Sequence, residues 1–118
     1  MRKFFEHLKW RTLWSLAGLK DTWVGEYSFR SWVWANLVSA ALALWLLEGA
    51  ALALMLALGV LVLAAELFNT AIERVVDLVS LEKSDLARQA KDAGSAGVMI
   101  TAIAAGIAWI VLLLGMLG

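Results

Sequence analysis

Three long runs without a charged residue divide the chain. They cover residues 31–47, 49–65 and 93–118, and Glu48 alone separates the first two. A helix that crosses a membrane needs about 20 apolar residues, within a range of about 17 to 25. In lipid the backbone must satisfy its own hydrogen bonds, which favours helices, and the sequence lacks the repeated alternation of a membrane β-barrel. The pattern therefore predicts an all-α membrane protein. The membrane helices expected are about 31–47, 49–81 and 91–117.

The charged and aromatic residues before the first run predict a different kind of helix. Residues 2–23 mix apolar and charged positions in a way that suits a helix lying on the membrane surface. Trp10 falls among the charged positions, so the pattern is imperfect, and a plain positive flank of the first span is the alternative. We expect an amphipathic surface helix within residues 1–30. Its interfacial anchors would be Phe4, Phe5, Leu8, Leu13, Trp14, Leu16, Leu19 and Trp23.

The basic residues predict the orientation in the membrane. All ten lysines and arginines lie either before the first apolar run or between the second and the third. Cytoplasmic loops carry an excess of such residues. The N-terminus and the segment between the second and third membrane helices are then cytoplasmic. A short turn around residues 47–50 and the C-terminus would lie outside.

Composition agrees with this picture and excludes several classes of protein. The chain has 118 residues, enough for one domain. It is 63% hydrophobic, with a mean hydropathy of +0.82 and 17% charged residues, which leaves too few polar side chains to cover a soluble monomer. There is no cysteine and one histidine, which excludes disulfides and argues against a Ser-His-Asp triad. The net charge of zero shows no basic footprint for nucleic acid.

Four polar residues interrupt the second membrane helix on one side, and we call them the polar stripe. Their spacings of 3, 4 and 4 place them within an arc of about 80° on a helix. The helix over 49–81 would be about 50 Å long against a hydrocarbon core of about 30 Å, so its second half emerges at the cytoplasmic face. Carboxylates at membrane depth are costly and usually mark function. The stripe consists of Glu66, Asn69, Glu73 and Asp77.

A solvent-exposed helix end is the other interpretation of the last two stripe residues. Glu73 would then pair with Arg74, and Asp77 would pair with a basic residue of the following loop. This interpretation does not explain Glu66 and Asn69, which lie within the apolar part of the helix.

Carboxylates and an amide beside lysines at a membrane face suit two kinds of chemistry. Mg²⁺ typically binds through one or two carboxylates plus substrate phosphates, and a further carboxylate could act as general base on an alcohol. Lys91 could neutralise phosphate charge, Glu26 lies on the same side, and the small residues at 94–97 suit close helix packing or lipid access. The chain has no Walker A loop and no protein-kinase glycine loop. From the residues alone, metal-dependent chemistry on a lipid and proton-coupled transport both stay open.

Two motifs in this region resemble those of the bacterial integral-membrane diacylglycerol kinase family, which includes undecaprenol kinases. The first, E-x-x-N-x-A-I-E-x-x-V-D, runs from Glu66 to Asp77, and the second, A-K-D-x-G-S-A, runs from Ala90 to Ala96. An upstream G-L-K followed by a tryptophan and an acidic residue also matches. The resemblance implies a homotrimer in the bacterial inner membrane, with residues 1–118 as a single integral-membrane kinase domain.

The resemblance also implies an activity and a site. The enzyme would transfer the γ-phosphate of MgATP to the hydroxyl of diacylglycerol, giving phosphatidic acid. Glu66 matches the family's catalytic base, and Glu26 and Glu73 match the carboxylates that hold the Mg²⁺ bridging ATP. The matches to lipid-binding positions are Lys20, Glu66 and Ser95. The matches to nucleotide-binding positions are Glu26, Asn69, Glu73, Asp77, Glu82, Lys83, Ser84, Lys91 and Asp92.

Other functions remain as alternatives at this point. The G-S-A after A-K-D resembles the diacylglycerol-using branch more than the undecaprenol-using one. Where the family often has an ATP-contacting arginine in the surface helix, this chain has His7. A small proton-coupled transporter with Glu66 as its proton site would belong to another class, although the acidic residues gather at one face and no inverted repeat is visible. A non-catalytic assembly factor would use the small-residue face only for packing.

Overall fold

The computed structural model describes residues 1–118 and contains helices only, which confirms the all-α class. A five-residue segment at 80–84 joins the last two helices and carries two charged residues of the predicted cytoplasmic loop, Glu82 and Lys83. The four helices are α1 (Arg2–Gly25), α2 (Tyr27–Leu46), α3 (Gly49–Val79) and α4 (Asp85–Leu117).

The helices extend beyond the charge-free runs from which they were predicted. α2 begins at Tyr27 rather than at 31, and α4 begins at Asp85 rather than at 91. α3 continues past the end of its charge-free run at 65 but ends at Val79, two residues before the expected 81. A charge-free run marks the apolar part of a helix, whereas the helix itself starts at its cap. Ser84 provides that cap for α4, because its hydroxyl accepts a hydrogen bond from the Ala87 N–H at 3.1 Å.

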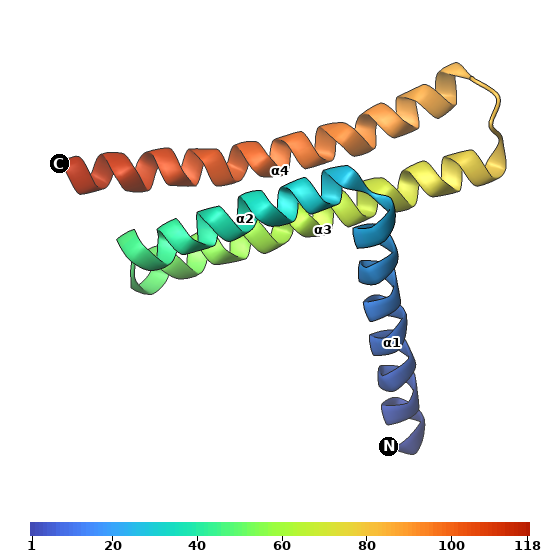
Figure 1. Ribbon diagram of the computed structural model, residues 1–118, viewed down its shortest axis with the longest axis horizontal. Coiled ribbons are helices and arrows are strands. Elements are labelled where there is room, and N and C mark those ends of the chain that lie inside the picture. The colour runs from blue at the N-terminus through green and yellow to red at the C-terminus, as the bar shows by residue number, and fades with distance from the viewer.

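The helices are arranged around α3, which contacts each of the other three. α2 and α3 form an antiparallel hairpin, and α4 runs back along α3 in the opposite direction (Figure 1). The hairpin turns at Gly49, whose φ of +58° is a conformation that glycine adopts without strain. α1 projects sideways from the start of α2, away from the bundle (Figure 1). This direction suits a helix on the membrane surface beside helices that cross the membrane.

Two of the helices, α3 and α4, are long and apolar enough to cross a membrane. α2 is not among them, although the charge-free run at 31–47 predicted a span there. The difference has a physical reason, since α2 includes Arg30, Asn36 and several serines and tryptophans that lower its hydropathy. The structure thus supports a membrane protein with two clear membrane-spanning candidates.

In this chain most large apolar side chains are exposed and few residues are buried, unlike in a soluble protein. Only nine of 118 residues are buried, and most of the large apolar side chains of α3 and α4 face outward. Four of the nine are polar or charged, namely Thr22, Glu66, Asn69 and Thr70. Lipid is the solvent that makes such a distribution favourable, because polar groups in a bilayer turn toward the bundle interior.

Two contacts between helices depend on small or polar side chains. Trp109 of α4 donates its indole N–H to the Ser39 hydroxyl of α2 at 2.9 Å, a kind of bond that adds about 0.6 kcal/mol between membrane helices. Gly94 of α4 lies against α3, where a Cβ on this residue would stand 2.5 Å from Asn69 Oδ1. Gly97 has no atom within 4 Å of such a Cβ. Of the two glycines in the small-residue face, Gly94 is therefore the one that allows α3 and α4 to approach closely.

Replacing Gly94 should therefore weaken the bundle. We expect Gly94→Ala to lower the free energy of unfolding by about 1–3 kcal/mol relative to Gly97→Ala, because the new methyl group must displace the buried Asn69 amide. Thermal unfolding in detergent, followed by circular dichroism, measures the difference. Gly97→Ala is the matched control, since it adds the same methyl group in open space. Equal melting temperatures for the two variants would contradict the assigned packing.

Candidate active site

Glu66 is a buried carboxylate within the apolar part of α3. Its exposed fraction is 4%, and its Oε1 accepts a hydrogen bond from the Ser28 hydroxyl at 2.8 Å. Ser28 lies in the first turn of α2, 38 positions away in the sequence. Ser28 was not among the predicted site residues, since no spacing rule connects a residue of one helix to a residue of the next. Asn69, the second residue of the polar stripe, differs because its side-chain oxygen has no hydrogen-bond partner.

Asn69 has one satisfied and one unsatisfied polar group. Its Nδ2 donates to Glu73 Oε1 at 3.2 Å, whereas its buried Oδ1 has no hydrogen-bond partner and lies next to Gly94. An unsatisfied buried acceptor costs about 1–3 kcal/mol. This oxygen is therefore an acceptor whose hydrogen bond the chain itself leaves unmade.

A cavity of about 520 Å³ lies between α2, α3 and α4 beside these two residues. It has a polar end, formed by Glu66, Asn69 and two serines, and an apolar remainder. Glu66 is its one ionisable lining residue. A lipid alcohol has the complementary shape, with a hydroxyl for the polar end and a chain for the apolar part. The lining residues are Ser28, Trp32, Glu66, Asn69, Ser95, Val98, Met99, Ala102 and Ile103.

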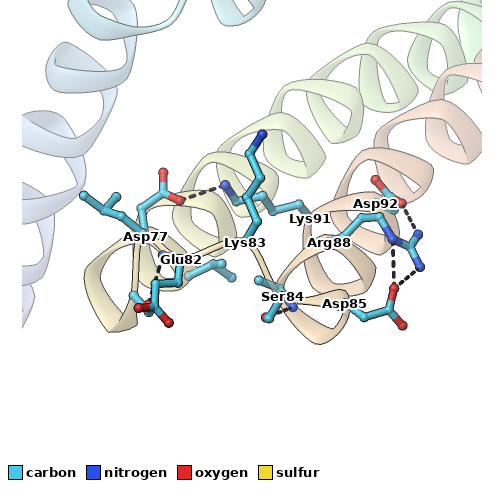
Figure 2. A pocket seen from close by; sticks show the side chains of 12 residues that line it. Asp77, Glu82, Lys83, Ser84, Asp85, Arg88, Lys91 and Asp92 are labelled. Carbon is cyan, nitrogen blue, oxygen red and sulfur yellow. Dashed lines mark hydrogen bonds and ion pairs between the residues drawn. The ribbon is translucent and has the colours of Figure 1, made fainter.

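A second cavity, of about 440 Å³, lies at the turn between α3 and α4 and is lined mainly by charged and polar side chains (Figure 2). Lys91 Nζ donates to Asp77 Oδ1 at 2.7 Å across this cavity. The pair is about half exposed, so it adds little stability and can be exchanged for another partner. The predicted nucleotide-binding residues that line this cavity are Asp77, Glu82, Lys83, Ser84, Lys91 and Asp92.

Arg88 belongs to the same cavity and was not among the predicted binding residues. Its guanidinium lies between two carboxylates, at 2.8 Å from Asp85 Oδ1 and 2.9 Å from Asp92 Oδ2 (Figure 2). The hydrogen bond from Arg88, aided by one from Gln89, lowers the pKa of Asp85. The hydrogen bond that Arg88 donates to Asp85, aided by the one that it donates to Asp92, in turn raises the pKa of Arg88. Its basic side chain near the start of α4 could have identified Arg88 as a candidate binding residue.

The two predicted metal ligands, Glu26 and Glu73, lie outside both cavities. Glu26 is the residue between α1 and α2, and its Oε1 lies 3.6 Å from Arg74 Nη2. Arg74 pairs with Glu26 rather than with Glu73, which contradicts one detail of the exposed-end interpretation. Asp77 pairs with Lys91, one of the basic residues between the second and third apolar runs, as that interpretation expected. No group of three or more His, Asp or Glu side chains in the chain is close enough to hold a metal ion.

Lys20 is the one predicted lipid-binding residue that the structure does not bring to the apolar cavity. It lies on the exposed surface of α1, whereas Glu66 and Ser95 line the cavity together. The site therefore consists of an apolar cavity at one end of the polar stripe and a charged cavity at the other.

Comparison with known proteins identifies one family. The sequence model described as prokaryotic diacylglycerol kinase matches residues 13–113 of the chain. The chain belongs to the prokaryotic diacylglycerol kinase family. The diacylglycerol kinase of Escherichia coli strain K12 is 39% identical over 100 residues, which are 84% of this chain and 82% of that protein. The Pseudomonas aeruginosa diacylglycerol kinase is 41% identical over 105 residues, which are 88% and 85% of the two chains.

Membership of the diacylglycerol kinase family confirms the resemblance and the expectation of a kinase. The Haemophilus influenzae member is 38% identical over 104 residues, 87% of this chain and 88% of that protein. The matched segment 13–113 contains both cavities and the whole polar stripe. It begins within α1, after His7. The site geometry described above is thus geometry of the segment that defines the family.

The Arg88 pair predicts a measurable change in a single pKa. We expect Arg88→Met to raise the pKa of Asp85 toward its ordinary value, because the variant removes the main hydrogen bond to the ionised carboxylate. Since the native pKa is lowered, the bond stabilises the start of α4 above a pH of about 4 and is lost as the pH falls through the lowered pKa. A carbon-detected NMR titration of Asp85 measures both values. An unchanged pKa in the variant would show that Arg88 does not bond to Asp85 in solution.

Proposed function

We propose that this kinase transfers the γ-phosphoryl group of MgATP to the primary hydroxyl of diacylglycerol and produces phosphatidic acid. The observation that carries the proposal is a buried carboxylate, Glu66, at the polar end of an apolar cavity. A phosphate acceptor on a lipid would place its hydroxyl there and its chains along Val98, Met99 and Ile103. The curated relatives named diacylglycerol kinase support this choice of acceptor.

In the proposed reaction Glu66 is the general base. The lipid hydroxyl oxygen bonds to the γ-phosphorus, its proton passes to Glu66, and the bond between the γ-phosphorus and the bridging oxygen of ADP breaks. A positioned base contributes typically 10²–10⁴-fold to such a step. Ser95, which lines the cavity from α4, would hydrogen-bond the hydroxyl, and Asn69 Oδ1 is a free acceptor beside it.

The nucleotide would bind at the charged cavity and extend along the polar stripe. Lys91 would exchange its bond to Asp77 for phosphate oxygens, and Lys83 has no ion pair to give up. Asp77 and Glu66 are 11 positions apart on α3, or about 16 Å along the helix axis. A triphosphate is shorter than this span, so it would lie along part of the stripe with the γ-phosphoryl group toward Glu66 and the rest of the nucleotide toward the charged cavity. Glu82, Ser84 and Asp92 would contact the rest of the nucleotide.

Mg²⁺ would reach the enzyme on ATP rather than reside in it. The donors present in one chain fit this role, because Mg²⁺ typically takes one or two carboxylates together with substrate phosphates. Glu73 lies on the stripe between Asp77 and Glu66, and Glu26 lies beside the next residue of α3 through its pair with Arg74. We propose that these two carboxylates hold the ion, which supplies charge neutralisation of the phosphates when bound.

The proposed arrangement in the membrane has three spans and a surface helix. α2 pairs with α3 along its length and has no charged residue after Arg30, which supports α2 as the third span despite its lower hydropathy. The basic residues would place the N-terminus and the site on the cytoplasmic side of a bacterial inner membrane, with the C-terminus outside. We further propose a homotrimer, as the resemblance to the family implies, and the exposed apolar faces of the single chain are compatible with such packing.

The base assignment predicts a selective loss of activity. We expect Glu66→Gln to lower kcat by about 10²–10⁴-fold, because the amide cannot accept the hydroxyl proton. Transfer of radiolabelled phosphate from ATP to diacylglycerol or to undecaprenol, in separate mixed micelles with Mg²⁺, measures the rate. Glu48→Gln is the matched control, since Glu48 is exposed at the opposite end of α3.

The two lipids separate the proposal from its alternatives. Phosphatidic acid from the parent and from Glu48→Gln supports the proposed reaction. Product from undecaprenol alone would assign the polyprenol as acceptor and keep the same base. If the folded protein phosphorylates neither lipid, the kinase proposal fails, and a proton-flux assay in vesicles would then test Glu66 as the proton site of a transporter.

The phosphate contact of Lys91 predicts a change in nucleotide affinity. We expect Lys91→Met to raise KM for MgATP about tenfold or more, because a hydrogen bond to a charged group contributes about 1.5–3 kcal/mol. The melting temperature should change little, since the Lys91–Asp77 pair is half exposed. Lys3→Met on α1 is the control, and initial rates against MgATP concentration give KM. A normal KM for Lys91→Met would exclude the contact.

A further inference from the structure

Ser28 is the only side chain that hydrogen-bonds Glu66. Its hydroxyl donates to Oε1 at 2.8 Å, and Oε2 has no protein donor. Both residues line the apolar cavity, where Glu66 is the single ionisable group and Trp32, one turn after Ser28, carries no charge. From α4 the cavity receives the Ser95 hydroxyl and apolar side chains only. One carboxylate oxygen is therefore anchored, and the other is left free.

The anchoring matters because of the length of the Glu66 side chain. A glutamate has three rotatable bonds, and its free carboxylate can point in several directions. A misplacement of about 1 Å between reacting groups can cost about 10²-fold in rate. A hydrogen bond from a neutral donor to one oxygen restricts these rotations and leaves the charge on the carboxylate.

The position of Ser28 is itself determined by the corner between α1 and α2. Glu26 is extended there, with φ −123° and ψ 108°, so that a new helix starts at Tyr27. Arg30 Nη1 donates to the carbonyl oxygens of Trp23 at 2.5 Å and Val24 at 3.1 Å, which closes the end of α1 onto the start of α2. These bonds hold the first turn of α2, with Ser28 in it, to the end of α1, and the pair between Glu26 and Arg74 connects this corner to α3.

We propose that Ser28 is a positioning residue, which holds Glu66 through Oε1 so that Oε2 accepts the proton of the lipid hydroxyl. This inference rests on the proposed function, in which Glu66 is the general base. Ser28 keeps its own proton throughout. The lipid oxygen bonds to the γ-phosphorus, its proton goes to Oε2, and ADP leaves with the electrons of the broken bond.

The test compares Ser28→Ala, Ser28→Thr and Ser31→Ala in the full chain. Ser31 is the matched control, because it lies on the same helix, is exposed, and bonds only to the Tyr27 carbonyl oxygen at 3.2 Å. We expect Ser28→Ala to lower kcat about tenfold, less than the ~10² of a full misplacement, with KM for MgATP unchanged. Ser28→Thr should restore most of kcat because it keeps the hydroxyl, and Ser31→Ala should match the parent.

A double-mutant cycle distinguishes positioning from a general structural role. In the Glu66→Gln background, Ser28→Ala should cause no further loss, since no base is left to position. A tenfold loss in that background as well, or a normal kcat for Ser28→Ala, would overturn the proposal. If Ser28→Ala does not fold, Ser28→Cys replaces it, because its weak thiol donor should give a kcat between those of Ser28→Thr and Glu66→Gln.

An infrared measurement keeps the inference separate from the proposed function. The carboxylate band of Glu66 is obtained by subtracting the spectrum of Glu66→Gln from that of the parent, without any lipid substrate or nucleotide. We expect this band to shift in Ser28→Ala and to stay in place in Ser31→Ala. An unshifted band overturns the hydrogen bond even in an active kinase, whereas a shifted band in a protein that phosphorylates no lipid refutes the proposed function alone.

Discussion

The structure depends on how the polar stripe of α3 is accommodated in apolar surroundings. A carboxylate or amide at membrane depth is expensive unless another group faces it. Two neighbouring helices supply partners to this stripe: α2 gives Ser28 to Glu66, and α4 gives Lys91 to Asp77. Asn69 donates to Glu73 within α3, and its oxygen stays without a partner where Gly94 of α4 approaches it. Ser28 and Lys91 thus mark the points at which α2 and α4 meet the polar stripe.

The same constraint divides the site into two environments. Near Glu66 the helices pack closely and the cavity is apolar except at one end. Near Asp77 the helices end, the loop at 80–84 begins, and the cavity is lined by charges. Phosphoryl transfer mostly requires positioning and charge neutralisation. A single helix that passes from one environment to the other can serve a lipid at one end and a nucleotide at the other, which is the arrangement we propose for this family member.

A large part of the fold and of the site was accessible from the sequence. The charge-free runs located three helices, and the motifs of the stripe and of the start of α4 indicated the family that the comparisons confirm. The helix ends were predicted less accurately where they depend on capping, as at Ser84. The membrane span was predicted less clearly where hydropathy is mixed, as in α2. It missed Ser28 and Arg88, because neither residue belongs to a motif and each matters through its neighbours.

Helix positions and the polar stripe follow from the sequence alone, because a helix repeats every 3.6 residues and places side chains three and four positions apart on one face. Only the tertiary structure decided which groups meet across helices. Ser28 and Glu66 are 38 positions apart, Lys91 and Asp77 are 14 apart, and Trp109 and Ser39 are 70 apart. No local periodicity relates residues at such separations, since their contact depends on the turn at Gly49, the corner at Glu26 and the close approach at Gly94.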